Sequence, residues 1–210
     1  MGANNPILTL PSESPEITDL ERSIQDRLKK ADVPEMFLDT SFQSLDPTRD
    51  PTAFQACHRF ALDGKYDDKS GLLLLGSPGN GKTSLSVAIM RHVIERFEGR
   101  YGVRFWNVPR GLQAIRQSFG DQYDGPQQDI LSITRNKLVV IDDLGRQKMT
   151  EWVADQFYVL IDTLWCEKKK VVITSNLEHT ALMGSQSEAL NSRLLGMCHV
   201  VEFNGDDMRI

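Results

Sequence analysis

The sequence predicts an α/β fold in which helices cover both faces of a parallel β-sheet. Five short apolar runs occur after residue 70, and their composition is typical of strands buried on both faces. The segments between them are longer and mostly helical in periodicity, as in right-handed crossovers between parallel strands. A glycine-rich loop follows the first run directly. The five runs are GLLLLG, VRFWNV, KLVVIDDL, KVVITSN and HVVEF.

Length and composition fit one domain with a short appendage. The 210 residues are 40% hydrophobic and 25% charged, close to the average for a globular chain. The 24 basic and 29 acidic residues give a net charge of -5, which argues against binding nucleic acid through bulk charge. A local basic patch is still compatible with this balance.

The cysteines and histidines indicate a protein of the reducing cytosol without a zinc site. The 3 cysteines are far apart, and neither they nor the 4 histidines have the spacing of metal ligands. No apolar run approaches the roughly 18 to 20 residues of a membrane-spanning helix, and the N-terminus lacks a secretory leader. We therefore expect a cytoplasmic protein with no membrane segment.

Two short helices are predicted ahead of the first strand. Thr18 and Glu21 have the spacing of a capping box, and apolar residues then recur every fourth position until Pro34. A second helix should begin at Asp50 and end near Gly64. The later helices are predicted from two apolar faces. These faces are Leu85, Ala88, Ile89, Val93 and Phe97, and Val153, Phe157, Leu160, Ile161 and Leu164.

The strongest chemical signal is the sequence GSPGNGKT, which has the spacing G-x4-G-K-T. It lies between an apolar strand and a helix, which is the context that a phosphate-binding loop requires. Backbone N–H groups of such a loop and the N-terminal end of the helix bind phosphates. Lys82 would neutralise the β- and γ-phosphates, and Thr83 would bind Mg²⁺. The expected nucleotide-binding residues are Gly76, Ser77, Pro78, Gly79, Asn80, Gly81, Lys82, Thr83 and Ser84.

Polar residues end two later apolar runs and complete a candidate catalytic set. Asp142 and Asp143 follow LVVI, and Asn176 follows VVITS. Ligands bind at the carboxyl edge of open α/β sheets, so these side chains should lie beside the phosphate-binding loop. We expect Asp142 to bind Mg²⁺ with Thr83, and Asp143 to polarise the attacking water. Asn176 would orient that water or the γ-phosphate.

Transfer of a phosphoryl group also needs positive charge on the γ-phosphate. Arg193 and Arg209, near the end of the chain, are the candidates. The residues alone do not say which arginine serves this role.

Taken together, the motifs GSPGNGKT, LVVIDDLG, VVITSNL, SRLLG and GDDMR resemble those of the AAA+ ATPases of the DnaC/IstB group. This group includes bacterial replicative helicase loaders and a transposition helper ATPase. The resemblance covers roughly residues 32–210. We divide the chain into an N-terminal arm and short helix, residues 1–35, as a candidate partner-binding region, and an AAA+ core, residues 36–210.

The resemblance implies a three-layer P-loop NTPase with strand order 5-1-4-3-2 and a reduced or absent lid. It implies that Asn176 is the sensor 1 residue, Arg193 the arginine finger acting on a neighbouring subunit and Arg209 the sensor 2 residue. It further implies an ATPase that uses ATP and Mg²⁺, forms an ATP-dependent homo-oligomer, and loads a hexameric replicative helicase onto single-stranded DNA.

Candidate DNA contacts lie in the segment PRGLQAIRQSFGDQYDGPQQ. Arg110 and Arg116 supply cations, and Phe119 supplies a ring for stacking bases. Phe119 also has the spacing of a buried helix face with Leu112 and Ile115, and that interpretation stays open. The run KKK at residues 168–170 fits either a helix C-terminus or a DNA contact.

The sequence also bears on other functions that use a phosphate-binding loop. An IstB-like transposition helper uses the same ATPase core and is the nearest alternative. The short side chain of Asp143 fits an ATP-binding switch with negligible hydrolysis. A small-molecule kinase would need an Arg-rich lid insertion, which is missing. A GTPase would need Asn-Lys-x-Asp, but residue 139 after Asn136 and Lys137 is Val.

Overall fold

The computed structural model describes residues 19–117, 132–145, 151–184 and 187–204. Its strands are β1 (Gly71–Gly76), β2 (Val103–Asn107), β3 (Leu138–Leu144), β4 (Lys170–Ser175) and β5 (Cys198–Phe203). They form one parallel sheet in the order β2-β3-β4-β1-β5. This is the order 5-1-4-3-2 counted from the opposite edge, so the expected topology is confirmed.

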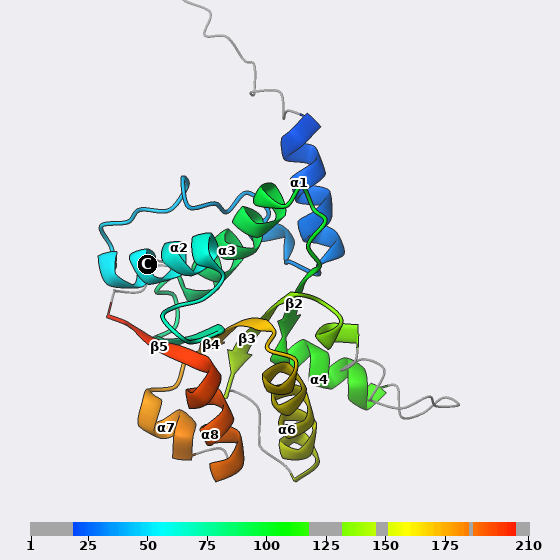
Figure 1. The fold of residues 1–210 in the computed structure, drawn as a ribbon, viewed down its shortest axis with the longest axis vertical. Helices are drawn as coiled ribbons and strands as arrows, with labels where there is room; N and C mark the ends of the chain where they lie inside the picture. Colours follow the sequence, from blue (N-terminus) through cyan, green and yellow to red (C-terminus); the bar gives the residue numbers. More distant parts are fainter. Residues whose placement is uncertain (1–18, 118–131, 146–150, 185–186, 205–210) are drawn as a thin grey trace, which may run out of the picture.

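Helices cover both faces of this sheet (Figure 1). The first layer holds α1 (Asp19–Lys30), α2 (Pro51–Asp63) and α3 (Lys82–Arg96), with the short 3-10 helix η1 (Glu35–Phe37). The second layer holds α4 (Val108–Gln117), α6 (Glu151–Cys166), α7 (His179–Gly184) and α8 (Glu188–Met197).

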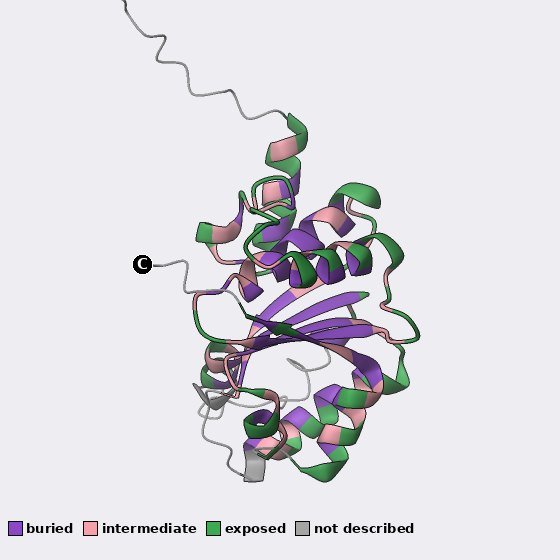
Figure 2. Ribbon diagram, turned by 90° about the vertical axis from the view of Figure 1, so that its left-hand side faces the viewer, coloured by how far each residue is buried: buried purple, intermediate pink, exposed green. Residues whose placement is uncertain are grey.

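Each layer packs on its own apolar cluster. Alternate residues of β1 point to opposite faces, so Leu72 and Leu74 join the cluster of α1, α2 and α3, while Leu73 and Leu75 join that of α4, α6 and α8. Figure 2 shows the buried strands between the two helical layers. Burial on both faces explains why the strands have continuous apolar sequences.

The second helix ahead of β1 begins and ends as predicted, whereas Thr18, the predicted cap of the first, lies outside the described residues. The side chain of Asp50 accepts a hydrogen bond from Ala53 N at 3.0 Å, and Gly64 ends α2 with φ 66°. The second carboxylate oxygen of Asp50 accepts from Asn204 N at 3.0 Å. This hydrogen bond connects the end of β5 to the start of α2.

Helix α1 packs against the first layer rather than standing apart from it. Ile24 and Leu28 are buried in the same cluster as α2 and α3. Arg91 of α3 is 7% exposed, forms an ion pair with Glu21, and donates to Leu38 O at 2.9 Å. The amphipathic pattern of α1 therefore reflects burial of its apolar side.

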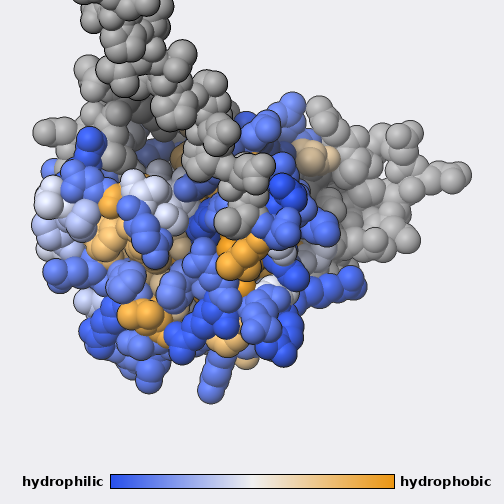
Figure 3. Space-filling view, turned by 90° about the horizontal axis from the view of Figure 1, so that it is seen from above, coloured by the Kyte–Doolittle hydropathy of each residue, from blue (hydrophilic) through white to orange (hydrophobic). Residues whose placement is uncertain are grey.

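Two local details differ from the prediction, and the lysine run lies where it was expected. Val108 begins α4 instead of ending a strand, and Phe97 at the end of α3 is 40% exposed. The lysine run spans the turn after α6 and the start of β4, where Lys169 pairs with Glu167 at 3.1 Å. The visible first-layer surface in Figure 3 is mostly hydrophilic with separate hydrophobic spots.

Candidate nucleotide-binding site

The glycine-rich loop joins β1 to α3 and depends on glycine at Gly76. Its φ is 145°, and a Cβ there would lie 2.7 Å from Phe203 O and 2.6 Å from Asn80 Nδ2. No larger residue fits this position without movement of β5. Glycine at this position therefore allows the sharp turn by which the chain leaves β1 and enters α3.

Lys82 lies inside the loop, where it is 5% exposed. Its ammonium donates to Gly76 O at 2.7 Å, to Ser77 O at 2.7 Å and to Asn80 Oδ1 at 2.9 Å. The side chain of Asn80 is 7% exposed, and its Nδ2 has no hydrogen-bond partner among the described residues.

Asp142, at the end of β3, collects hydrogen bonds from three other elements. Its Oδ1 accepts from Thr83 Oγ1 at 2.9 Å and from Thr174 Oγ1 at 2.9 Å. Its Oδ2 accepts from Asn107 Nδ2 at 3.1 Å. The carboxylate is 6% exposed and is fixed in one orientation beside the hydroxyl of Thr83. Carboxylate and hydroxyl oxygens suit Mg²⁺, which commonly binds through one or two protein carboxylates together with substrate phosphates.

Asp143 and Asn176 form a second pair at the same edge. The register between β3 and β4 shifts between Ile141 and Leu144, so the two aspartates lie in an irregular part of the strand. Asp143 has φ 64°, and its N–H donates to Thr174 Oγ1 at 2.9 Å. Asn176 Nδ2 donates to Asp143 Oδ1 at 2.7 Å. This arrangement holds the second carboxylate next to the amide of Asn176.

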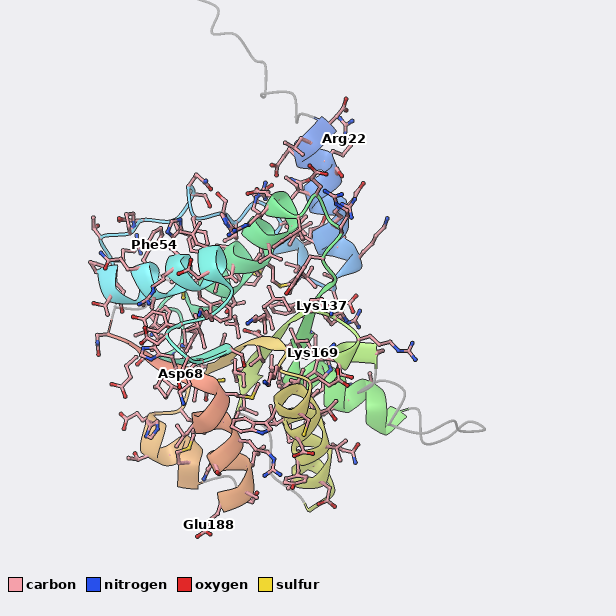
Figure 4. The ribbon with its side chains drawn as sticks, viewed as in Figure 1. Arg22, Phe54, Asp68, Lys137, Lys169 and Glu188 are labelled. Atoms are coloured by element: carbon pink, nitrogen blue, oxygen red, sulfur yellow. The ribbon has the colours of Figure 1, made fainter. Side chains whose placement is uncertain are left out.

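Two cavities flank the loop. One, of about 590 Å³, lies between the loop, Asn176 and the end of β5, and Glu178 and Glu202 contribute to its wall. The other, of about 300 Å³, is walled by Leu45, Phe54, Leu85 and Phe203 and contains Asn80 at its base. Figure 4 labels Phe54 on α2, on the side of the sheet that carries α3.

The model of the IstB-like ATP binding protein family matches residues 21–210 of the chain. The chain belongs to this family. The match includes α1 from its third residue, the loop with Lys82, the Asp142 cluster and the last strand. Membership agrees with the nucleotide-binding chemistry that these side chains present.

Several proteins are similar to this IstB-like chain. The replicative helicase loader DnaI of Bacillus subtilis is 28% identical over 66% of the chain and 44% of its own length. A protein of an insertion sequence in Mycobacterium tuberculosis is 27% identical over 80% of the chain and 68% of its own length. The chain spans about half the length of two Bacillus subtilis relatives, DnaI among them.

The fold is shared with a solved structure. The crystal structure of the DnaC helicase loader has a TM-score of 0.69 and 20% sequence identity, and the match covers 81% of this chain and 100% of that one. The expected α/β fold with a five-stranded parallel sheet is therefore confirmed.

Arg193 lies on α8, in the layer opposite α3. Its Nε donates to Asp162 Oδ1 at 2.6 Å, its Nη2 to Tyr158 Oη at 2.8 Å and its Nη1 to Ala189 O at 3.2 Å. The guanidinium lies 4.7 Å from the centre of the Tyr158 ring. The hydrogen bond to Asp162 raises the pKa of Arg193. Arg193 is therefore not brought together with Lys82 and Asp142 within this chain.

The remaining candidates are only partly placed. Arg209 and Phe119 lie outside the described residues, as does the side chain of Arg116. Arg110 is exposed at the start of α4 and lines a cavity of about 760 Å³ with Lys29 and Arg104. The cavity is also lined by Asp32 and Glu35. All three DNA-contact assignments, Arg110, Arg116 and Phe119, thus stay predictions.

Sequence analysis missed Thr174 and Asn107, which both hold Asp142. Each ends or nearly ends an apolar run, as Asp142 does, and that shared position was the available signal. This position brings the two side chains to Asp142 only because β2, β3 and β4 are neighbours in the sheet.

The described residues hold no candidate metal cluster, and two of the cysteines are buried. No cluster of three or more His, Cys, Asp or Glu suited to a metal occurs in this part of the chain. Burial raises the pKa of the Cys57 and Cys198 thiols, so both are neutral core residues. Among the described helices, none combines the length and hydrophobicity needed to cross a bilayer.

Proposed function

We propose that the chain is a Mg²⁺-dependent ATPase, and the observation that carries this proposal is the hydrogen bond between Thr83 and Asp142 beside the buried Lys82. Thr83 and Asp142 would hold Mg²⁺, which when bound neutralises charge on the β- and γ-phosphates. Lys82 would exchange its carbonyl partners in the loop for phosphate oxygens. Backbone N–H groups at the start of α3 add to phosphate binding.

Asp143 and Asn176 are the proposed water-activating pair. The carboxylate of Asp143 orients a water molecule towards the γ-phosphate and accepts its proton as ATP is cleaved to ADP and phosphate. Asn176, held 2.7 Å from that carboxylate, positions it and donates to the γ-phosphate. The short side chain of Asp143 favours slow turnover, which suits a switch between two assembly states.

The smaller cavity is the proposed site of the adenine base. Part of its wall is apolar and aromatic, from Leu45, Phe54, Leu85 and Phe203, and polar side chains line the rest, a mixture that base-binding pockets commonly have. The cavity is also lined by the loop residues Asn80 and Gly81. The free Nδ2 of Asn80 can donate to an acceptor nitrogen of the base.

For the assembled protein we propose loading of a ring-shaped replicative helicase onto single-stranded DNA. ATP would bridge copies of the chain, with Arg193 of one copy reaching the γ-phosphate bound to the next and Arg209 acting on the nucleotide of its own copy. Residues 1–35 would bind the helicase, and Arg110, Arg116 and Phe119 would contact DNA. Similarity to DnaI and DnaC supports this version.

A transposition helper is the second candidate. The relative from an insertion sequence aligns with 80% of the chain, against 66% for DnaI, and this broader match favours a transposase as partner. Such a helper would act on duplex DNA. An ATP-binding switch with negligible hydrolysis is the third version, in which Asp143 is too short to activate water.

The test is ATP turnover per subunit as protein concentration rises, without DNA, with single-stranded DNA and with duplex DNA. The loader predicts specific activity that climbs with concentration and changes with single-stranded DNA. A response to duplex DNA alone favours the transposition helper. Tight Mg²⁺-ATP binding without turnover favours the ATP-binding switch. A lack of nucleotide binding contradicts the whole proposal.

A further inference from the structure

Three of the N–H groups of the Arg193 guanidinium form hydrogen bonds with residues of α6 and α8. An arginine has five N–H donors, and three are used by Asp162, Tyr158 and Ala189. One N–H therefore remains on each terminal nitrogen. The side chain is 27% exposed, so this pair can be approached from outside. Two such donors match two oxygens of one phosphate.

Phosphates bound by the same copy are out of reach of this pair. The loop with Lys82 leads into α3, whereas Arg193 packs with α6 on the other face of the sheet. Neither cavity beside the loop is lined by a described residue of α6 or α8. Figure 4 shows Phe54 and Glu188, at the start of α8, on opposite sides of the sheet. The phosphate that Arg193 fits must come from another molecule.

Exposed apolar side chains share the helices that hold Arg193. Val159 and Trp165 of α6 are 45% and 42% exposed, and Leu195 of α8 is 39% exposed. Trp165 lies against Gly196, where a Cβ would be 2.4 Å from its ring. Aromatic and aliphatic groups with an arginine are typical of protein interfaces.

We propose that Asp162 and Tyr158 are positioning residues that aim Arg193 at the γ-phosphate bound by a second copy of the chain, across the contact between copies that the proposed function already assumes. The inference rests on the proposed ATPase function, but it assigns roles to residues outside the nucleotide site.

Positioning follows from the geometry of the three contacts. A free arginine side chain samples many rotamers, and fixing it in one costs conformational entropy each time it binds. Asp162 and Tyr158 fix Nε and Nη2 in advance, so the open donor pair has one direction. Loss of this direction should lower the rate of hydrolysis and leave binding of ATP by the other copy unchanged.

The test uses mixed oligomers of the full chain. A donor copy carries Lys82→Ala and keeps Arg193, and an acceptor copy carries Arg193→Ala and keeps the nucleotide site. Turnover in this mixture measures the donor's arginine alone. Asp162→Ala is then placed in the donor or in the acceptor, with Asp155→Ala, an exposed aspartate of the same helix, as the matched control.

We expect Asp162→Ala in the donor to lower kcat by about tenfold or more at unchanged KM for ATP. The same change in the acceptor should leave turnover intact, which a merely structural role would not produce. Tyr158→Phe, which keeps the ring and loses the hydroxyl, should have a smaller effect in the donor. Asp155→Ala should be neutral in either copy.

The outcomes separate this inference from the function on which it rests. If the unmodified donor fails to restore turnover to the acceptor, the shared nucleotide site itself is wrong. If it restores turnover and the Asp162→Ala donor does so equally well or better, only the positioning role is wrong. Equal losses with Asp162→Ala in donor and acceptor would also overturn that role.

Discussion

Thr83 donates its hydroxyl hydrogen to Asp142 Oδ1 at 2.9 Å and so links the first turn of α3 to the end of β3, 59 residues apart in the sequence. The same carboxylate also accepts hydrogen bonds from Thr174 of β4 and Asn107 of β2. Four elements, α3, β2, β3 and β4, thus meet at one buried acid.

Asp142→Asn should remove the effect of Mg²⁺ on ATP binding. The amide has nearly the shape of the carboxylate but lacks its charge, which Mg²⁺ needs in a ligand. Titration calorimetry with ATP should show tighter binding in Mg²⁺ than in chelator for the parent chain and equal binding for the variant. Asp155→Asn, with the same loss of charge at an exposed position of α6, should behave as the parent.

Thr174→Val should lower both stability and turnover. Valine has a similar volume but loses the donor to Asp142 and the acceptor for Asp143 N, which leaves buried polar groups unpaired. We expect a loss of about 1–3 kcal/mol in the free energy of unfolding. Thr174→Ser keeps the hydroxyl and should retain most of both quantities in urea titration and ATPase assays.

Lys82→Ala should abolish ATP binding because it removes the cation from the loop. Lys137→Ala removes an exposed lysine ahead of β3, labelled in Figure 4, and should leave binding unchanged. Binding of a fluorescent ATP analogue compares the two. Full ATP affinity in Lys82→Ala would refute the assignment of the phosphate-binding loop.

Gly111→Ala should destabilise the chain, whereas Gly184→Ala should not. A Cβ at Gly111 in α4 would lie 2.0 Å from Trp106 Nε1, and one at Gly184 in α7 has no neighbour within 4 Å. Forced repacking should lower the free energy of unfolding by about 1–3 kcal/mol in the first variant. Thermal unfolding measures the pair, and similar melting temperatures would contradict the close packing of α4 on Trp106.

His92 should make the chain less stable at acidic pH. Burial lowers the pKa of His92 below its ordinary value of 6.5, with His58 and Arg96 acting in the same direction and Glu95 opposing them. The unfolded chain then binds a proton more readily, so the free energy of unfolding should fall as pH drops through and below about 6.5. Above that pH this contribution is constant. Urea titrations of His92→Gln should show a smaller decrease with acid, and an unchanged pH dependence would count against this origin.

The sequence was most informative where a structure is specified by neighbours along the chain. The loop around Lys82, the capped helix that starts after Asp50 and the apolar strands each follow from local spacing, and each is present. The pairing of Asp143 with Asn176 was accessible because both end apolar runs that parallel topology brings to one edge.

Contacts between distant elements were less accessible. Thr174 and Asn107 reach Asp142 only because three strands are neighbours, and Asp162 holds Arg193 only because α6 and α8 pack together. Helical periodicity placed α6 against the core but could not identify which helix would face its polar side. The partner of a surface arginine is decided by tertiary packing, which leaves no periodic signal.

The placement of Lys82 and Arg193 on opposite sides of one sheet has a consequence for symmetry under the proposed contact. Two copies that meet through unlike surfaces cannot satisfy each other by a twofold rotation, so every added copy repeats the same head-to-tail step. If the steps do not close on themselves, one end always presents a vacant nucleotide site and the other an unused arginine. Such an assembly has a direction, and its two ends can recruit different molecules.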